Sequence, residues 1–320
     1  MEKGFDKLSH RILIDKMKSD GFSDFTFNFV INYLSSRLQR VRWQSTYGDY
    51  LPVCSGIPQG SCIGPFVFNY YCADMPYPVS DDVMLVKYAD DIIIIAKVKL
   101  DCRKSPLLST FSEILRWSDE NKMTIKSEKS HQMFVTLRSN YDMDDFFIPQ
   151  IPVCKFIKIL GVTFDSNLNF RQHVHNISKK ASSRLHVLRK LKPFLPTSGL
   201  VQIYNNCVRS ILEYSAAMFV GFSSSNNSSL ERVQNRAHKI ICGSSTCDCS
   251  NFLPLEYRRL MIGFDIFSSL SQDQNHPLHH LCPQRLAYSN KFTMPVCLTA
   301  MRSSSFLVKM IKLSNSGFVR

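Results

Sequence analysis

Two adjacent aspartates at the tip of a predicted β-hairpin constrain this chain more than any other feature. The segment Tyr88-Ala89-Asp90-Asp91 separates two short apolar runs, Val83–Lys87 and Ile92–Ala96. Runs of this length and composition are typical of strands that are buried or nearly so. Aspartate is also common in turns, because it tolerates turn geometry, so a purely structural role is one interpretation of the pair.

The second interpretation is a metal site. Two carboxylates at the tip of a buried hairpin repel each other unless a cation lies between them. Mg²⁺ suits this position because it takes carboxylate oxygens and keeps sites open for phosphate. In phosphoryl transfer, two such ions about 4 Å apart hold the attacking and leaving oxygens. The pair Asp90 and Asp91 therefore indicates nucleotidyl transfer.

The charge of the chain agrees with a polyanionic partner. The 320 residues carry a net charge of +13, with a pI of about 9.2 and 44% apolar residues. This balance favours nucleic acid, then an anionic membrane surface, over a merely basic soluble protein.

No apolar run approaches the roughly 20 residues of a membrane span, and we expect no membrane partner. The eleven cysteines are scattered, and we expect no signal peptide because no long apolar stretch follows the charges near Met1. We therefore expect reduced thiols in an intracellular protein, nuclear or cytoplasmic and not secreted.

Apolar periodicity predicts a mixed fold. Helices are predicted near residues 12–21, 25–34, 63–73, 109–121, 174–191 and 200–219, and from 228 onward. Strands are predicted at residues 50–54, 83–87, 92–96, 131–137 and 156–164, the last interrupted at Gly161. Ser228 and Glu231 have the spacing of a capping box. Residues from about 251 show less regularity, and residues 166–212 contain no Asp or Glu.

Taken in order, several segments resemble the motifs of non-LTR (LINE-type, jockey-like) retrotransposon reverse transcriptases. The palm motifs are matched by Phe5–His10, Ser36–Val41, Ser55–Ser61 with Gly64-Pro65 and Phe68, Tyr88–Asp91, Lys122–Ser130 and Leu160–Val162. The region after the palm is matched by Lys179–Ala181, Val208–Tyr214, Leu230–Arg236 and Leu255–Leu260. The likeness covers residues 5 to about 260.

The resemblance implies an α+β fold, a right-hand polymerase palm of antiparallel sheet and packed helices followed by a helical thumb. It divides the chain into a partial palm (1–165), a basic helical thumb-like domain (166–250) and a C-terminal segment of unknown role (251–320). The implied activity is RNA-directed DNA polymerisation. The implied partners are an RNA template, a DNA primer and deoxynucleoside triphosphates, with Mg²⁺ as the cofactor.

The resemblance also assigns roles to residues. Asp90 and Asp91 would bind the metals, and Phe5 would act as a steric gate against a ribose 2′-hydroxyl, unless it is only a core residue. Lys129 would face the departing pyrophosphate, although a solvated lysine is an equal alternative. The other assigned residues are Gln59, Gly60 and Ser61 at the nucleotide and template pocket and Leu160 and Gly161 at the primer grip.

The thumb-like domain would hold nucleic acid through its basic residues. The helix predicted at 174–191 carries the basic side chains Lys179, Lys180, Arg184, Arg189 and Lys190. Contacts of such side chains with phosphates are independent of base sequence and sensitive to salt. A basic, solvated helix face is the alternative interpretation.

The sequence departs from the family pattern at its start. The family's first catalytic carboxylate precedes the Asp of the Phe-Asp pair by six residues, a position before Met1. In an extended strand, Asp6 would lie about 20 Å and Glu2 about 7 Å from that position. We therefore expect an N-terminally truncated reverse transcriptase with an incomplete two-metal site. The alternative is a catalytically inactive, nucleic-acid-binding remnant.

Overall fold

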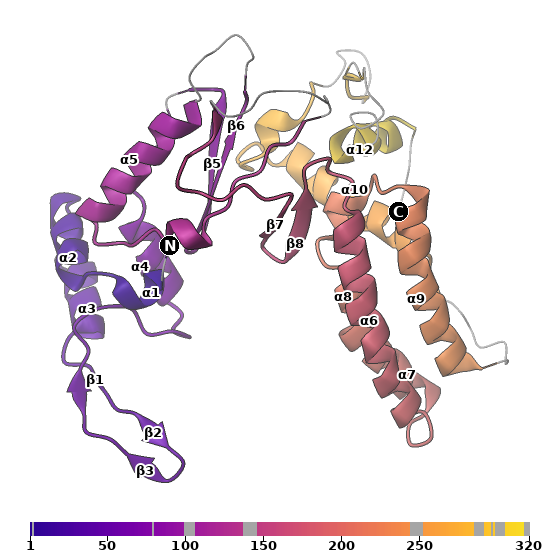
Figure 1. The fold of residues 1–320 in the computed structure, drawn as a ribbon, viewed down its shortest axis with the longest axis horizontal. Helices are drawn as coiled ribbons and strands as arrows, with labels where there is room; N and C mark the ends of the chain where they lie inside the picture. Colours follow the sequence, from indigo (N-terminus) through magenta and orange to yellow (C-terminus); the bar gives the residue numbers. More distant parts are fainter. Residues whose placement is uncertain are drawn as a thin grey trace. The chain divides into compact units, whose positions relative to one another are not determined.

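The structure is a computed structural model, and it describes residues 1, 3–78, 80–98, 106–136, 146–243, 252–284, 291–295, 297 and 305–316. The chain divides into two compact units, Met1–Lys155 (unit 1) and Phe156–Arg320 (unit 2). Figure 1 shows the elements of both units. Helices and small antiparallel sheets occur together, so the α+β class is confirmed at this coarse level, while the predicted domain boundaries stay a prediction.

Unit 1 contains five α-helices in its described part. They are α1 (Gly4–Lys7), α2 (His10–Ser19), α3 (Asp24–Leu34), α4 (Gly64–Tyr71) and α5 (Pro106–Glu120). Its strands are β1 (Leu38–Gln39), β2 (Arg42–Trp43), β3 (Thr46–Tyr47), β4 (Leu51–Pro52), β5 (Val83–Tyr88) and β6 (Asp91–Ala96). The side chain of Ser23 accepts a hydrogen bond from the Thr26 amide and caps the start of α3.

The core of unit 1 forms where the helices meet the β5–β6 hairpin. Its most buried side chains include Leu8, Leu13, Phe68, Tyr71 and Ile114. Burial of each such side chain contributes roughly 1.5–3 kcal/mol. This core fixes α1 and α4 relative to the hairpin, and both helices carry residues of the motifs that the sequence shows.

The β5–β6 hairpin is less buried than the sequence predicts. Its strands pair antiparallel from Val83 with Ala96 to Tyr88 with Asp91. Val83 and Leu85 are buried, but Met84 and Ile95 on the other face are half-exposed. The expectation of two buried strands is therefore wrong for one face of the hairpin. The helices pack against the face of Val83 and Leu85, and the opposite face stays open to solvent.

Unit 2 begins with a hairpin and continues as helices. The hairpin joins β7 (Phe156–Ile159) to β8 (Val162–Asp165). The α-helices are α6 (Arg171–Leu191), α7 (Thr197–Tyr204), α8 (Ser210–Leu212), α9 (Ser224–Cys242), α10 (Leu255–Gln272) and α12 (Phe306–Asn315). A π-helical turn, Asn205–Arg209, joins α7 to α8, and the 3-10 turn Ala216–Phe219 follows. Leu185, Leu188 and Ala237 pack in the core between α6 and α9.

Three sequence-based expectations for unit 2 are wrong. The single interrupted strand at 156–164 is a hairpin, because Leu160 and Gly161 both adopt positive φ. Helix α9 begins at Ser224 rather than Ser228, because Ser223 caps it and the buried Asn226 bonds to the Asn169 carbonyl. The segment after 251, expected to be irregular, contains the 18-residue helix α10.

Two further expectations are corrected. The strand predicted at 131–137 is only an isolated bridge, Gln132 with Val153, within its described residues. The Gln132 side chain instead bonds to the backbone of Ile148 and Ile151. Cys242 is disulfide-bonded, against the expectation of reduced thiols throughout. Within the described residues no helix has the length and apolar character needed to cross a bilayer.

Candidate polymerase site and nucleic-acid interface

The Asp90–Asp91 pair lies at the turn of the β5–β6 hairpin. Ala89, the first residue of the turn, has a φ of 50°, which suits the tight turns that match strand twist. The Asp90 side chain is half-buried and that of Asp91 is exposed. Neither carboxylate makes a hydrogen bond or ion pair to another residue of the described ranges. Both therefore remain available for a cation.

The start of the chain packs against this turn. The Met1 amino group donates a hydrogen bond to the Asp90 carbonyl at 2.5 Å. Gly4 is buried between Phe68 of α4 and Asp90 of the turn. A Cβ at Gly4 would lie 2.9 Å from Phe68 Cζ and 3.4 Å from Asp90 Cβ. Only a residue without a side chain fits there, and this close approach brings Phe5 next to the aspartate turn.

Phe5, the predicted steric gate, stacks on a core residue. The Phe5 and Phe68 rings lie 4.4 Å apart at an interplanar angle of 17°. Phe68 is buried, while Phe5 is half-buried. One face of the Phe5 ring is thus held by the core, as the structural interpretation requires. Its partial exposure keeps it open to the role of a gate as well.

The loop 55–61 is bonded to the same N-terminal segment. Backbone hydrogen bonds join Gly56 to Leu8 at 2.8 Å and Ile57 to Phe5 at 2.7 Å. The Gln59 side-chain amide donates to Asp6 Oδ1 at 3.0 Å. These bonds join Gln59 to the segment of Phe5, and the approach of Gly4 to Asp90 joins that segment to the aspartate turn. Asp6 lies in helix α1 and binds Gln59, so a strand carrying it toward the aspartates is not formed.

Ser61 and Gly60 occupy different surroundings in this loop. The Ser61 hydroxyl lies 2.5 Å from the Tyr33 hydroxyl and accepts a hydrogen bond from the Gly64 amide at 3.0 Å, at the start of α4. Gly60 has a φ of 85°, and no atom lies within 4 Å of a Cβ built there. The Gly60 backbone therefore faces open space.

Lys129 is not connected to this cluster. It ends a short 3-10 helix, Ser127–Lys129, and its side chain is exposed. No hydrogen bond or ion pair joins the Lys129 ammonium to another described residue. The role of Lys129 stays a prediction. Glu2, the other acidic candidate considered from the sequence, lies outside the described residues.

The predicted primer grip forms the tip of the β7–β8 hairpin in unit 2. Leu160 and Gly161 are the two turn residues, with φ values of 46° and 86°. Two positive φ values in a two-residue loop define the turn class that suits antiparallel strands. The Tyr214 hydroxyl donates to the Leu160 carbonyl at 2.7 Å. The sequence placed Tyr214 in a motif without showing this contact.

The predicted basic residues are all exposed on α6. They are Lys179, Lys180, Arg184, Arg189 and Lys190. At about 3.6 residues per turn they spread over most of the helix surface that the core does not use. They do not gather on one narrow face.

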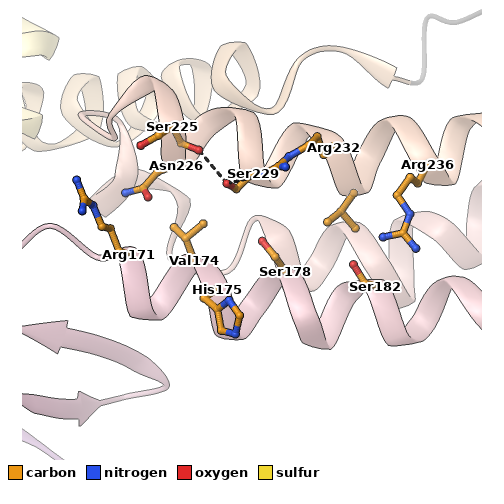
Figure 2. A pocket seen from close by; sticks show the side chains of 11 residues that line it. Arg171, Val174, His175, Ser178, Ser182, Ser225, Asn226, Ser229, Arg232 and Arg236 are labelled. Atoms are coloured by element: carbon orange, nitrogen blue, oxygen red, sulfur yellow. Dashed lines mark hydrogen bonds between the residues drawn. The ribbon is translucent and has the colours of Figure 1, made fainter.

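A basic groove that sequence reasoning missed runs between α6 and α9 (Figure 2). Its volume is about 620 Å³, and no carboxylate lines it. Each helix supplies a stripe at steps of four, three and four residues, which lies on one helix face. The stripes are Arg171, His175, Ser178 and Ser182 on α6, and Ser225, Ser229, Arg232 and Arg236 on α9. The matching stripes were visible in the sequence, but the pairing of the helices was not.

Some polar groups of the groove are hydrogen-bonded and others are not. Arg232 donates to the Ser228 carbonyl and to Ser229 Oγ, and Ser229 Oγ donates to the Ser225 carbonyl. Arg171 and Arg236 make no ion pair with any described residue. The Ser178 hydroxyl is buried without a hydrogen-bond partner. Glu231, the acidic residue of α9, bonds instead to Gln234 and the Leu255 amide. The groove thus presents uncompensated positive charge and hydroxyl donors, a combination that suits phosphate oxygens.

These features together fit a template-directed nucleic-acid polymerase: a carboxylate pair on a hairpin, a half-buried aromatic beside it, and a basic helical unit. Residues 1–164 match the reverse transcriptase (RNA-dependent DNA polymerase) family, and this match covers half of the chain. The chain therefore belongs to the reverse transcriptase family, whose domain has a polymerase palm-like fold.

Curated relatives point to the same kind of element. The chain is 25% identical over 258 residues to a probable RNA-directed DNA polymerase from transposon BS of Drosophila melanogaster, covering 75% of this chain and 28% of that protein. It is 25% identical over 252 residues to a similarly described protein of transposon X-element, covering 76% and 28%. It is 25% identical over 260 residues to the RNA-directed DNA polymerase from mobile element jockey, again covering 76% and 28%. All three relatives are from Drosophila melanogaster.

These matches confirm the resemblance to non-LTR retrotransposon reverse transcriptases that the motifs indicated. The chain spans about 28% of the length of these relatives.

Proposed function

We propose that this chain supplies the palm and thumb of an RNA-directed DNA polymerase, with nucleotidyl transfer at the Asp90–Asp91 turn. The observation that carries the proposal is the assembly of three distant motifs into one cluster. Gly4 packs against Asp90, Phe5 stacks beside it, and Gln59 bonds to the neighbouring Asp6. The motifs that carry these residues are expected to form a nucleotide-incorporation site. Chance packing would not be expected to bring all of them together.

The donor set at the turn fits Mg²⁺. Asp90 and Asp91 would hold the ion, because both carboxylates are oxygen ligands without a competing partner among the described residues. When bound, Mg²⁺ supplies charge that stabilises the phosphoryl group during transfer. Phe5 would exclude a ribose 2′-hydroxyl by contact with its half-exposed ring. Gln59, Gly60 and Ser61 would line the nucleotide and template pocket, with the open backbone of Gly60 allowing close approach.

The nucleic acid would be held by unit 2. Leu160 and Gly161 would contact the primer, since both lie at an exposed hairpin tip. The α6–α9 groove would bind backbone phosphates, because its arginines and serine hydroxyls are unopposed by carboxylates. The basic side chains on the outer surface of α6 would add sequence-independent attraction. Lys129 would serve as the charge partner of pyrophosphate.

A second candidate function is nucleic-acid binding without catalysis. The observation that favours it is the small number of metal ligands. The described residues contain no group of three or more His, Cys, Asp or Glu side chains that could hold a metal ion. A two-metal site needs further oxygen ligands besides Asp90 and Asp91.

Primer extension on an RNA template with Mg²⁺ separates the two candidates. The first predicts incorporation of deoxynucleotides that Asp90→Asn abolishes. Asp15→Asn is the matched control, because Asp15 is an exposed carboxylate on α2, and it should leave extension unchanged. Salt-sensitive binding of primer–template without any extension would establish the second candidate instead. Absence of both binding and extension would remove both.

A further inference from the structure

Residues 35–52 form an arm that is exposed along its entire length. Figure 1 shows β1, β2 and β3 extending beyond α2 and α3 within unit 1. Two short antiparallel strand pairs hold the arm. Strand β1 pairs with β4, with Leu38 opposite Pro52, and β2 pairs with β3, with Arg42 opposite Tyr47. A two-stranded ribbon of this kind is only marginally stable in water. Its exposure therefore indicates a surface that a partner covers.

The arm presents large aromatic rings to solvent. Trp43 is 75% exposed, Tyr50 59% and Tyr47 47%. Trp43 makes no ring or cation contact with another described residue. Rings of this kind are flat stacking surfaces, and every nucleobase has a face that can stack on them.

Arginines are interleaved with these rings. The Arg40 guanidinium lies 4.0 Å from the centre of the Tyr47 ring and 4.6 Å from that of Tyr50. Arg42 lies 5.4 Å from the Tyr47 ring. The Arg42 Nε donates to the Gln44 carbonyl at 3.1 Å. The other N–H groups lie along the guanidinium edges, where stacking leaves them able to donate hydrogen bonds to phosphate.

The charge of the arm selects among possible occupants. Residues 35–52 contain three arginines, Arg37, Arg40 and Arg42, and one carboxylate, Asp49. A second copy of the arm would bring like charges together, which disfavours pairing between copies. A polyanion with stacked, accessible bases matches both the charge and the rings. Duplex bases are already stacked, so a single strand fits better.

We propose that the arm binds single-stranded nucleic acid, with bases stacked on Trp43, Tyr47 and Tyr50 and phosphates held by Arg40 and Arg42. This activity goes beyond nucleotidyl transfer, since it requires no metal and no carboxylate of the hairpin turn. Binding by the arm would secure an unpaired strand in a manner independent of base sequence.

Tryptophan fluorescence tests the proposal directly. The chain has two tryptophans, at 43 and 117. Trp117 is buried, and its indole N–H donates to Asp74, so its emission serves as an internal reference. Titration of the full chain with oligothymidylate or oligouridylate of about 15 nucleotides, a length in the range of single-strand sites, should quench Trp43. Trp43→Phe should remove that quenching. Unquenched emission from Trp43 in a saturated complex would overturn the proposal.

Affinity measurements complete the test. Trp43→Ala and the pair Tyr47→Ala with Tyr50→Ala should each weaken oligonucleotide binding about tenfold or more. Phe194→Ala and Arg11→Ala are matched controls, because Phe194 is 79% exposed outside the arm and the Arg11 side chain 91% exposed. These controls should change the affinity less than twofold. Equal affinities for all variants would overturn the proposal, as would loss of self-association in Trp43→Ala with oligonucleotide affinity retained.

A crosslinking experiment avoids dependence on the variants. Bromouridine-containing single strands irradiated with the wild-type chain should crosslink within residues 35–52. Crosslinks confined to other segments would contradict the arm as the binding surface. The result is independent of primer extension, so the proposed polymerase and the proposed arm can fail separately.

Discussion

The hydroxyl of Tyr214 donates a hydrogen bond to the carbonyl of Leu160 at 2.7 Å and ties the β7–β8 hairpin tip to the segment that follows α8. The same tyrosine lies against Gly161, where an added Cβ would come 3.1 Å from its ring. One side chain therefore holds both residues of the predicted primer grip. Positioning of this turn depends on Tyr214 as well as on the strand pairing.

Removal of the Tyr214 hydroxyl should loosen the turn. Tyr214→Phe keeps the ring but removes a hydrogen bond that contributes about 1 kcal/mol. We expect amide exchange in residues 156–165 to accelerate about fivefold, measured by hydrogen–deuterium exchange. Tyr257→Phe is the control, since Tyr257 is comparably exposed on α10 and should leave exchange in the hairpin unchanged. Equal protection in wild type and Tyr214→Phe would show that strand pairing alone holds the turn.

Two glycines of the loop 55–61 should respond differently to alanine. Both have positive φ, 83° at Gly56 and 85° at Gly60, which costs an L-residue roughly 1–2 kcal/mol. At Gly56 the new Cβ would also lie 2.6 Å from the Asp6 carbonyl oxygen, whereas nothing is near Gly60. Gly56→Ala should therefore cost about 2–5 kcal/mol and Gly60→Ala only about 1–2 kcal/mol. Urea unfolding followed by Trp117 fluorescence measures the difference, and equal losses would contradict it.

Local chemistry made much of unit 1 predictable. Apolar residues spaced along one face predicted α3, and the apolar runs around the aspartates predicted the hairpin. These features depend on neighbours in the sequence. Contacts between distant segments were not predictable in this way. The bond from Gln59 to Asp6 and the stacking of Phe5 on Phe68 arise from tertiary packing.

The errors in unit 2 have the same origin. Ser224 to Ser228 have modest helix propensity, yet α9 begins there because Asn226 is buried against the Asn169 carbonyl. The groove between α6 and α9 likewise required knowledge of which helix faces meet. The sequence did show that residues 166–212 are basic and lack acids, but it did not show which basic residues face a concave surface.

An ion pair in unit 2 should be important for stability. Both oxygens of Glu213 bond to the Arg258 guanidinium, and Arg209 lies 3.6 Å away. The Glu213 hydrogen bond raises the pKa of Arg258. The Glu213 side chain is 12% exposed, so Glu213→Gln should cost roughly 1–4 kcal/mol by leaving Arg258 without a charge partner. Thermal unfolding followed by circular dichroism measures this loss.

Asp273→Asn provides the comparison in the same unit. Asp273 is exposed at the end of α10, and asparagine keeps the side-chain oxygen that accepts from the Asn275 amide, so this change should cost less than about 0.5 kcal/mol. A loss of stability in Asp273→Asn as large as in Glu213→Gln would contradict a specific role for the Glu213–Arg258 pair.

Unit 2 should lose stability in mild acid through His173. Burial lowers the pKa of His173 below its ordinary value of 6.5, and its Nδ1 accepts a hydrogen bond from the Thr163 amide at 3.2 Å. The unfolded chain therefore binds a proton more readily than the folded chain. Stability from the neutral ring is complete above pH 6.5 and is lost as the pH falls through the lower, folded pKa.

Melting temperatures at pH 7.5 and pH 5.5 test this dependence. Wild type should be less stable at the lower pH, and His173→Gln, which keeps an acceptor oxygen but does not titrate, should show a smaller difference. Identical pH dependence in the two proteins would exclude His173 as the source. Other histidines of unit 2 are common to both proteins and cancel in the comparison.

The salt dependence of nucleic-acid binding should distinguish the groove from the outer surface of α6. The groove set Arg171, Arg232 and Arg236 and the outer set Lys179, Lys180 and Arg184 each contain three cations, so triple glutamine variants remove equal charge. Removing one cation that neutralises a phosphate reduces the slope of log affinity against log salt by about 0.7–0.9. If the groove binds phosphates directly, its variant should lower the slope by about 2 and the outer variant by less than about 1. The reverse order would assign phosphate binding to the exposed face of α6. Equal slopes for the two variants would indicate long-range attraction alone, since both variants lose the same charge.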